Sequence, residues 1–193
     1  ITDTTSGFSR TFDVTLNVVS EPPAQVADIT GNAGTSGNIV IGGSNYHVYE
    51  GIYLEAEIGA ANFTSAGTAI NQIAFSCSTV GTTPTVASPN YNIYLQNVPS
   101  GTTTLATGAY STAGYTLVYS GPFSYPATGF QGVTLTTPFV RTAGSNVQVL
   151  IERTDNVVHS GNIWNAAMGN LAAGSGALTS RRYNSTVVPV SGT

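Results

Sequence analysis

The sequence predicts an all-β protein, an antiparallel β-sandwich of jelly-roll type, and two features of the chain support this prediction. The first is a set of short runs in which apolar and polar residues alternate, as in strands with one buried face. These runs lie at 91–95, 117–119, 133–135 and 147–151. The second is the clusters of turn-forming residues between runs, at 98–101, 120–122 and 142–146. Only residues 163–171 suggest a helical turn.

The first twenty residues are predicted to be separate from the sandwich. Phe12, Val14, Leu16 and Val18 alternate with polar residues, which gives residues 1–20 the form of the last strand of a preceding immunoglobulin-like repeat. Residues 21–30 begin with Glu-Pro-Pro and are interpreted as a linker, because paired prolines end a strand. Residues 31–193 then form the sandwich module. Since one strand cannot bury its own apolar face, we expect it to pair with a neighbouring immunoglobulin-like repeat of a longer modular protein.

Charge is scarce in this chain, which narrows the classes of partner. Only 7% of the 193 residues are charged, against about 25% in an average domain, and the net charge is −4. The only basic cluster is Arg181-Arg182, so a nucleic-acid partner is not expected. No apolar run approaches the roughly 18 residues of a membrane span. Such polar, charge-poor chains are typical of extracellular modules, and we expect an extracellular or cell-surface location.

Residues 44–60 contain the most conspicuous group of titratable residues. In a strand, Glu55 and Glu57 would point to one face about 6–7 Å apart, a spacing that suits a calcium site or a glycosidase pair. Ala56 and Ile58 would then face the core, which is the ordinary pattern of a sheet with polar residues outside. We therefore favour structural glutamates and a protein that is not an enzyme. The alternative is a metal site in which Glu55, Glu57 and Asp155 bind Ca²⁺. No other cofactor is expected.

Aromatic residues give the main indication of a ligand. Exposed tyrosine and tryptophan rings stack on sugars, so Tyr46, Tyr49 and Trp164 are candidate ligand-binding residues and a glycan is the leading ligand. Packing of these rings in the sheet is the alternative interpretation. Short acceptor patterns also make Thr4, Asn62 and Asn184 candidate glycosylation sites.

Several stretches, in this order, resemble a β-sandwich module of large surface and secreted proteins of Bacteroidetes. They are EGIYLEAEIG (50–59), TAINQIAFSCS (68–78), PNYNIYLQNV (89–98), TLVYSGPFSY (116–125), FQGVTLTTPFVRTAGSNVQVLIERTDN (130–156) and RRYNS (181–185). The resemblance implies export by the type IX secretion system, whose machinery would be a partner of the parent protein. It also implies a role in adhesion or gliding motility, and it brings no catalytic residues with it.

Together these observations predict a non-catalytic adhesive or ligand-binding module of a large bacterial surface protein, with a surface glycan or a protein as its ligand. Two alternatives remain open at this stage. One is an accessory, carbohydrate-binding-like domain of a secreted hydrolase. The other is a subunit or repeat of a surface filament in which residues 1–20 act as an exchanged strand.

Overall fold

The computed structural model describes residues 37–41, 45–60, 69–77, 90–106, 109–123, 127, 129–153, 155–157, 163–166 and 180–185. Side chains are described for residues 45–58, 69–74, 90–106, 109–123, 127, 132–153 and 155–157. Statements about the fold refer to these residues.

The described chain is mostly β and contains one short helix. The strands are β1 (Gly37–Ile41), β2 (Tyr46–Tyr53), β3 (Ala69–Cys77), β4 (Asn90–Pro99), β5 (Thr116–Pro122), β6 (Gly129–Val140), β7 (Ser145–Arg153), β8 (Ile163–Ala166) and β9 (Ser180–Ser185). The helix α1 (Glu55–Ala60) follows β2 almost directly.

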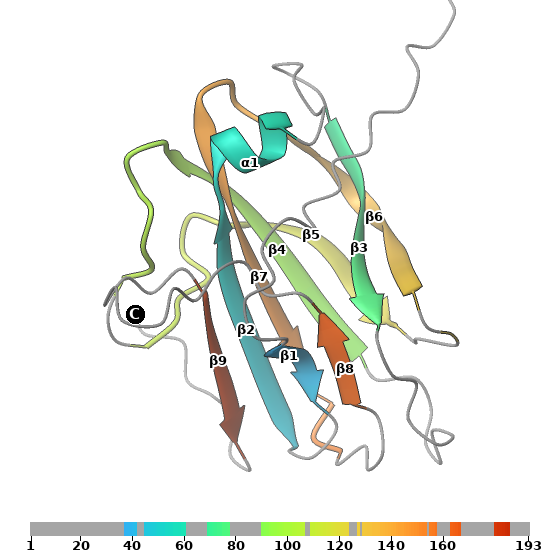
Figure 1. The fold of residues 1–193 in the computed structure, drawn as a ribbon. Coiled ribbons are helices and arrows are strands. Elements are labelled where there is room, and N and C mark those ends of the chain that lie inside the picture. Colours follow the sequence, from blue (N-terminus) through green and yellow to red (C-terminus); the bar gives the residue numbers. More distant parts are fainter. Residues whose placement is uncertain are drawn as a thin grey trace, which may run out of the picture.

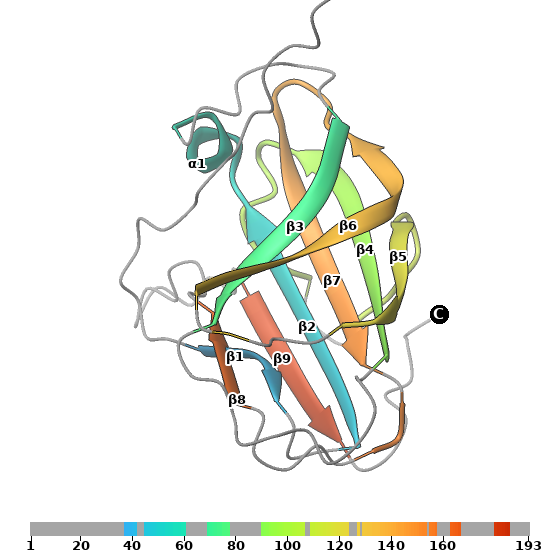
Figure 2. The ribbon, with the colours of Figure 1, turned by 90° about the vertical axis from the view of Figure 1, so that its right-hand side faces the viewer.

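Five strands form the larger sheet, in the order β5-β4-β7-β2-β9, and every neighbouring pair is antiparallel. A two-stranded antiparallel sheet of β3 and β6 lies across one face of this sheet, which we call the inner face (Figures 1 and 2). A third, two-stranded sheet pairs β1 with β8. The arrangement is sandwich-like and has the antiparallel sheets that the sequence predicts, but the helix α1 makes the described chain mostly β rather than all-β.

The main core lies between the inner face and the two-stranded sheet of β3 and β6. Alternate residues of each strand supply it, as expected for a strand with one buried face. Its buried members are Tyr49, Ile58, Tyr91, Ile93, Leu95, Val118, Phe123, Val133, Leu135, Phe139, Val147, Val149 and Ile151. The burial of β4 residues on every second position shows this pattern directly.

The opposite, outer face of the sheet is covered over β2 and β7 by the segment between β4 and β5. Val48 and Leu150 pack there with Tyr110 from that segment, and Tyr94 and Tyr115 contact this second cluster. As a result β7 is buried on both faces for most of its length.

Three local predictions were wrong. Residues 55–60 are helical rather than extended, and on this helix Ile58 is buried while Ala56 is exposed. Residues 163–166, where a helical turn was expected, form β8, which pairs with β1. The turn expected at 120–122 lies within β5.

Other sequence predictions stand differently. The turn expected at 142–146 is present, with Ser145 N–H donating to the Thr142 carbonyl at 3.2 Å and Gly144 at a φ of 69°. The predicted strand in residues 1–20 and the linker at 21–30 lie outside the described residues. None of the described helices has the length and apolar character needed to cross a bilayer.

Candidate functional site

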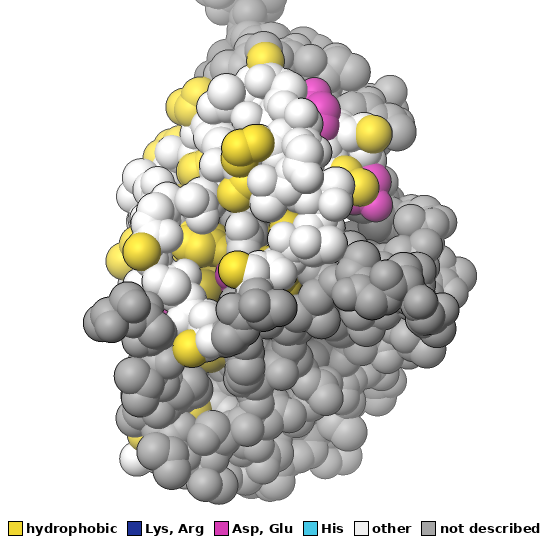
Figure 3. Space-filling model, turned by 90° about the vertical axis from the view of Figure 1, so that its left-hand side faces the viewer, with side chains coloured by type: hydrophobic (Ala, Val, Ile, Leu, Met, Phe, Trp, Pro, Cys, Tyr) yellow, Lys and Arg dark blue, Asp and Glu magenta, His cyan; other side chains and the backbone are white. Residues whose placement is uncertain are grey.

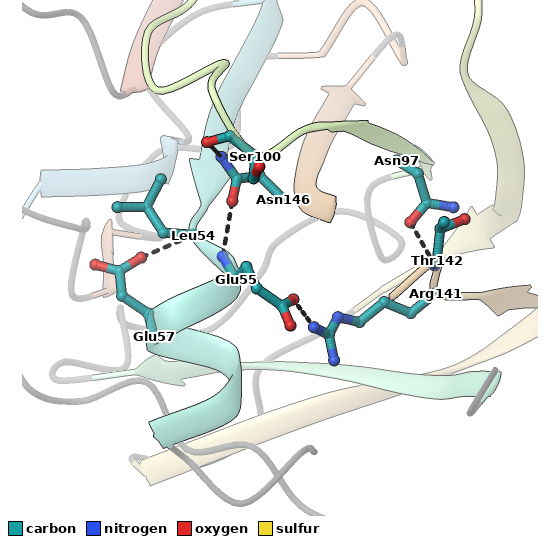
Figure 4. A network of polar contacts seen from close by, with 8 residues as sticks. All are labelled: Leu54, Glu55, Glu57, Asn97, Ser100, Arg141, Thr142 and Asn146. Atoms are coloured by element: carbon teal, nitrogen blue, oxygen red, sulfur yellow. Dashed lines mark hydrogen bonds and ion pairs between the residues drawn. The ribbon is translucent and has the colours of Figure 1, made fainter. Parts of the chain in front are cut away.

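The two glutamates of α1 have structural partners (Figure 4). The Glu57 carboxylate accepts a hydrogen bond of 2.9 Å from the backbone N–H of Leu54, the residue just before the helix. This is one half of a capping box, in which the third helical residue satisfies a backbone donor that the helix cannot. Glu55 forms an ion pair with Arg141, whose side chain is 1% exposed. Both carboxylates therefore hold the helix in place.

Asn146 fixes the start of the same helix to the rest of the domain. Its amide nitrogen donates to the carbonyl oxygens of Ser100 (3.1 Å) and Thr102 (2.9 Å), and its amide oxygen accepts from Glu55 N–H (2.7 Å). Nearby, Asn97 accepts from Thr142 N–H at 3.0 Å. Three chain segments thus meet at this end of the sheet through amide side chains, as Figure 4 shows.

Asp155 lies at the other end of β7. It pairs with Arg153, whose Nε is 3.4 Å from the Asp155 carboxylate, and Arg153 also donates to the Val157 carbonyl at 3.3 Å. Asn146, which contacts Glu55, and Arg153, which pairs with Asp155, are seven residues apart in the extended strand β7, a separation of about 23 Å. The structure therefore does not bring Glu55, Glu57 and Asp155 together as one metal site. Among the described residues, no group of three or more His, Cys, Asp or Glu side chains could hold a metal ion.

The tyrosines predicted to bind a ligand are buried. Tyr46 is 8% exposed and Tyr49 is 1% exposed, and Tyr49 belongs to the main core. Burial is also the main cause of the raised pKa of Tyr49. Trp164 occupies a position on β8 opposite Val40, where only the backbone is described. Ligand binding by these residues stays a prediction, and the burial of Tyr46 and Tyr49 counts against ring stacking by either.

The glycosylation predictions are not tested by the fold. Thr4 and Asn62 lie outside the described residues. Asn184 lies in β9, opposite His47 of β2 in the strand register.

The outer face contains a polar cluster that the sequence reasoning did not single out. Glu50 is 3% exposed and its carboxylate accepts hydrogen bonds of 2.7 Å from both the Tyr115 hydroxyl and the Gln148 amide. Glu152 is 8% exposed and accepts from the Tyr94 hydroxyl at 3.0 Å. We call these five residues the outer-face cluster.

The strand register brings the two carboxylates of this cluster near each other. Val48 pairs with Glu152 and Glu50 pairs with Leu150, so the two glutamates are diagonal neighbours on adjacent strands. An acidic residue inside each of two apolar stretches, YHVYEGIYL and VQVLIERT, was the available signal. Reading it required knowledge that β2 and β7 are adjacent.

Tyr94 and Tyr110 on this face have raised pKa values. Burial, together with the Glu152 carboxylate, raises the pKa of Tyr94 to about 12. The same two causes raise the pKa of Tyr110, which belongs to the segment covering this face. A neutral hydroxyl can donate to a carboxylate, so the raised pKa of Tyr94 favours its hydrogen bond to Glu152.

The charged side chains that the structure describes are all at least partly withdrawn from solvent. They are Glu50, Glu55, Glu57, Arg141, Glu152, Arg153 and Asp155, and each is classed as buried or intermediate. The view of the molecule from the side opposite to Figure 2 agrees, because the described residues there are mostly neutral (Figure 3). The described part of the surface consequently offers mainly amides, hydroxyls and apolar groups, with a few partly exposed carboxylates (Figure 3).

The chain was compared with protein-family models, curated proteins and solved structures. No family model, curated protein or solved structure matches the chain. The resemblance to the Bacteroidetes surface module therefore stays a prediction.

Proposed function

We propose that the chain is a non-catalytic, ligand-binding module of a large secreted or cell-surface bacterial protein, with adhesion as its role. A neutral glycan is its leading ligand, and the sandwich is of jelly-roll type. These statements extend the predictions made from the sequence.

The proposal is supported mainly by the contacts of the described carboxylates, each of which has a partner within the fold. Glu50 and Glu152 accept hydrogen bonds from side chains of the fold, Glu55 and Asp155 pair with arginines, and Glu57 caps a helix. A general acid or base must reach the proton that it transfers. Each of these carboxylates has a partner within the fold, which favours a structural role for it.

The small number of charged side chains on the described surface also supports the adhesive role. Surfaces of small soluble domains ordinarily carry roughly a quarter to a third charged residues. A surface of hydroxyl, amide and aromatic groups suits an uncharged partner that is recognised through hydrogen bonds and ring stacking.

The proposal can be tested with purified protein in a binding assay and an enzymatic assay, run in parallel. We expect selective retention on a glycan array or on immobilised bacterial and host surfaces, together with no turnover of a panel of glycosides and peptides. A hydrolytic activity that disappears in the double variant Glu50→Gln/Glu152→Gln would contradict the non-catalytic proposal, provided that the variant keeps its circular dichroism spectrum.

A further inference from the structure

The outer face of the larger sheet is covered at one end and open at the other. Over β2 and β7 the side chains of Val48, Glu50 and Leu150 are between 0% and 3% exposed beneath the segment that joins β4 to β5. Toward the sheet edge formed by β5, exposure increases. There Leu117 is 46% exposed, Ser120 is exposed, and Asn92 and Tyr94 are half-buried.

These four residues form one continuous surface, which we call the β4–β5 ledge. The register pairs Tyr94 with Leu117 and Asn92 with Ser120, so two side chains from each strand lie on the same face. A β-bulge explains why Leu117 faces outward. The pairing shifts between Ile93 and Tyr94, which leaves Val118 as the additional residue of β5, and Val118 is buried in the main core.

Both polar residues and the aromatic ring of the ledge are held in position. Ser120 donates from its hydroxyl to the Asn92 side-chain oxygen at 2.8 Å. The Tyr94 hydroxyl donates to Glu152, which lies next to Asn92 in the register. Side chains that are already ordered lose less conformational entropy when a ligand binds.

We propose that the β4–β5 ledge binds a neutral oligosaccharide, with Leu117 and the Tyr94 ring contacting the apolar face of a sugar and the Asn92–Ser120 pair hydrogen-bonding its hydroxyl groups. The inference rests on the proposed ligand-binding function and locates the binding site on the ledge. The ledge itself carries no charge. The Glu152 carboxylate beside it on the same face disfavours an anionic ligand, and an amide, a hydroxyl and an aromatic ring suit an uncharged polyhydroxylated one.

The chain offers a matched control for the apolar contact. Leu117 and Val140 are the large hydrophobic side chains that stand out as exposed among the described residues, and Val140 lies on β6 at 57% exposure. Leu117→Ser and Val140→Ser both remove an exposed apolar side chain, so neither is expected to disturb folding. Only the first change falls on the ledge.

The experiment is a titration with neutral oligosaccharides of glucose, mannose, galactose and xylose, followed by two-dimensional amide NMR. Binding should shift resonances of residues 92–94 and 117–120. The affinity should fall about 3- to 10-fold in Leu117→Ser and by a similar factor in Asn92→Ala, which corresponds to the loss of one modest contact. It should stay within about 2-fold in Val140→Ser, and it should change little between low and high salt, since no ion pair is involved.

The outcomes separate this inference from the proposed function. Glycan binding that Leu117→Ser and Asn92→Ala leave unchanged would overturn the ledge while the ligand-binding function stands. Retention only on protein surfaces, with no shift by any neutral sugar, would also overturn the ledge. Absence of binding to glycans and to cell surfaces alike would overturn both.

Discussion

Replacing Tyr115 by Phe removes one hydroxyl from the outer-face cluster and should destabilise the domain clearly. The Tyr115 hydroxyl donates to the Glu50 carboxylate at 2.7 Å across 65 residues of sequence. The carboxylate is 3% exposed, so water cannot readily replace the lost donor. The phenyl ring itself is kept, so the change removes only the hydroxyl group.

The magnitude follows from the charge and the burial of the acceptor. A hydrogen bond to a charged group contributes about 1.5–3 kcal/mol to stability, roughly twice the contribution of a neutral one. Gln148 still donates to the same carboxylate oxygen in the variant, which keeps the cost within that range. For a chain of this size, 1 kcal/mol corresponds to about 2–4 °C in melting temperature.

Tyr119→Phe is the matched control. The Tyr119 hydroxyl donates to the Pro122 carbonyl only three residues away, in an exposed hydrogen bond, so its removal should cost about 0.5 kcal/mol. Urea unfolding followed by circular dichroism measures both variants. The expected result is a lower midpoint for Tyr115→Phe with an unchanged slope against denaturant.

A double-mutant cycle with Glu50→Gln tests the pairing itself. If the hydroxyl acts through this carboxylate, Tyr115→Phe should cost less in the Glu50→Gln background than in the unaltered protein. Equal costs of Tyr115→Phe and Tyr119→Phe, or a cycle without coupling, would refute the reasoning that the carboxylate is what makes this hydrogen bond strong.

Three further predictions concern the other polar contacts of the described structure. Asn146→Ala should lower the free energy of unfolding by about 2–4 kcal/mol in urea titrations, because it leaves three backbone groups without the partner that ties α1 to the sheet, whereas Asn97→Ala, with its exposed hydrogen bonds, should cost about 1 kcal/mol. Glu55→Gln should cost about 1–3 kcal/mol by the same measurement, because it removes a carboxylate from the buried Arg141 guanidinium, and a cost near zero would show that other groups suffice for Arg141. The unfolded phenol of Tyr94 ionises near its usual pKa of 10 and the folded one at about 12, so the folded state holds more protons between these values and stability should fall from pH 10 to pH 12. Tyr94→Phe should make that fall shallower, and an unchanged slope would contradict the assignment.

Strands with one buried face were predictable from the sequence because their side chains alternate. Ile93 and Leu95 of β4 and Val133 and Leu135 of β6 are buried at alternate positions, as their apolar character predicts. Strand β7 was harder to interpret. Its alternation marks the inner face, but burial of Leu150 and Glu152 on the outer face depends on a distant covering segment.

The helix α1 shows where the period of two misleads. Over four residues, Glu55-Ala56-Glu57-Ile58 satisfies the alternation of a strand. The deciding features are Leu54 and Ile58, which are four residues apart and lie on one side of a helical turn, with Ile58 N–H donating to the Leu54 carbonyl at 3.0 Å. A capping glutamate three residues after the first position of the turn supports the same choice.

The candidate site could not be predicted because pairing between distant segments creates it. Tyr94 and Leu117 are 23 positions apart, and their meeting depends on a bulge whose position the sequence does not mark. The aromatic residues that attracted attention in the sequence, Tyr46 and Tyr49, instead lie on a central strand and are buried there. The number of tyrosines suggested a ligand. Only the pairing of β4 with β5 shows that Tyr94 is the tyrosine on the ledge.

The buried carboxylates of the outer face call for an explanation other than stability. Hydrophobic residues of similar volume at such positions are often as stable or more stable, since burying a charge requires its desolvation. Glu50 and Glu152 instead fix the orientations of Tyr94, Tyr115 and Gln148 through directional hydrogen bonds. An aliphatic core would hold these side chains less uniquely, because its contacts have no direction. These charges lie beneath the covering segment and order the Tyr94 ring of the neighbouring ledge without adding charge to the ledge, which fits the proposed recognition of an uncharged ligand.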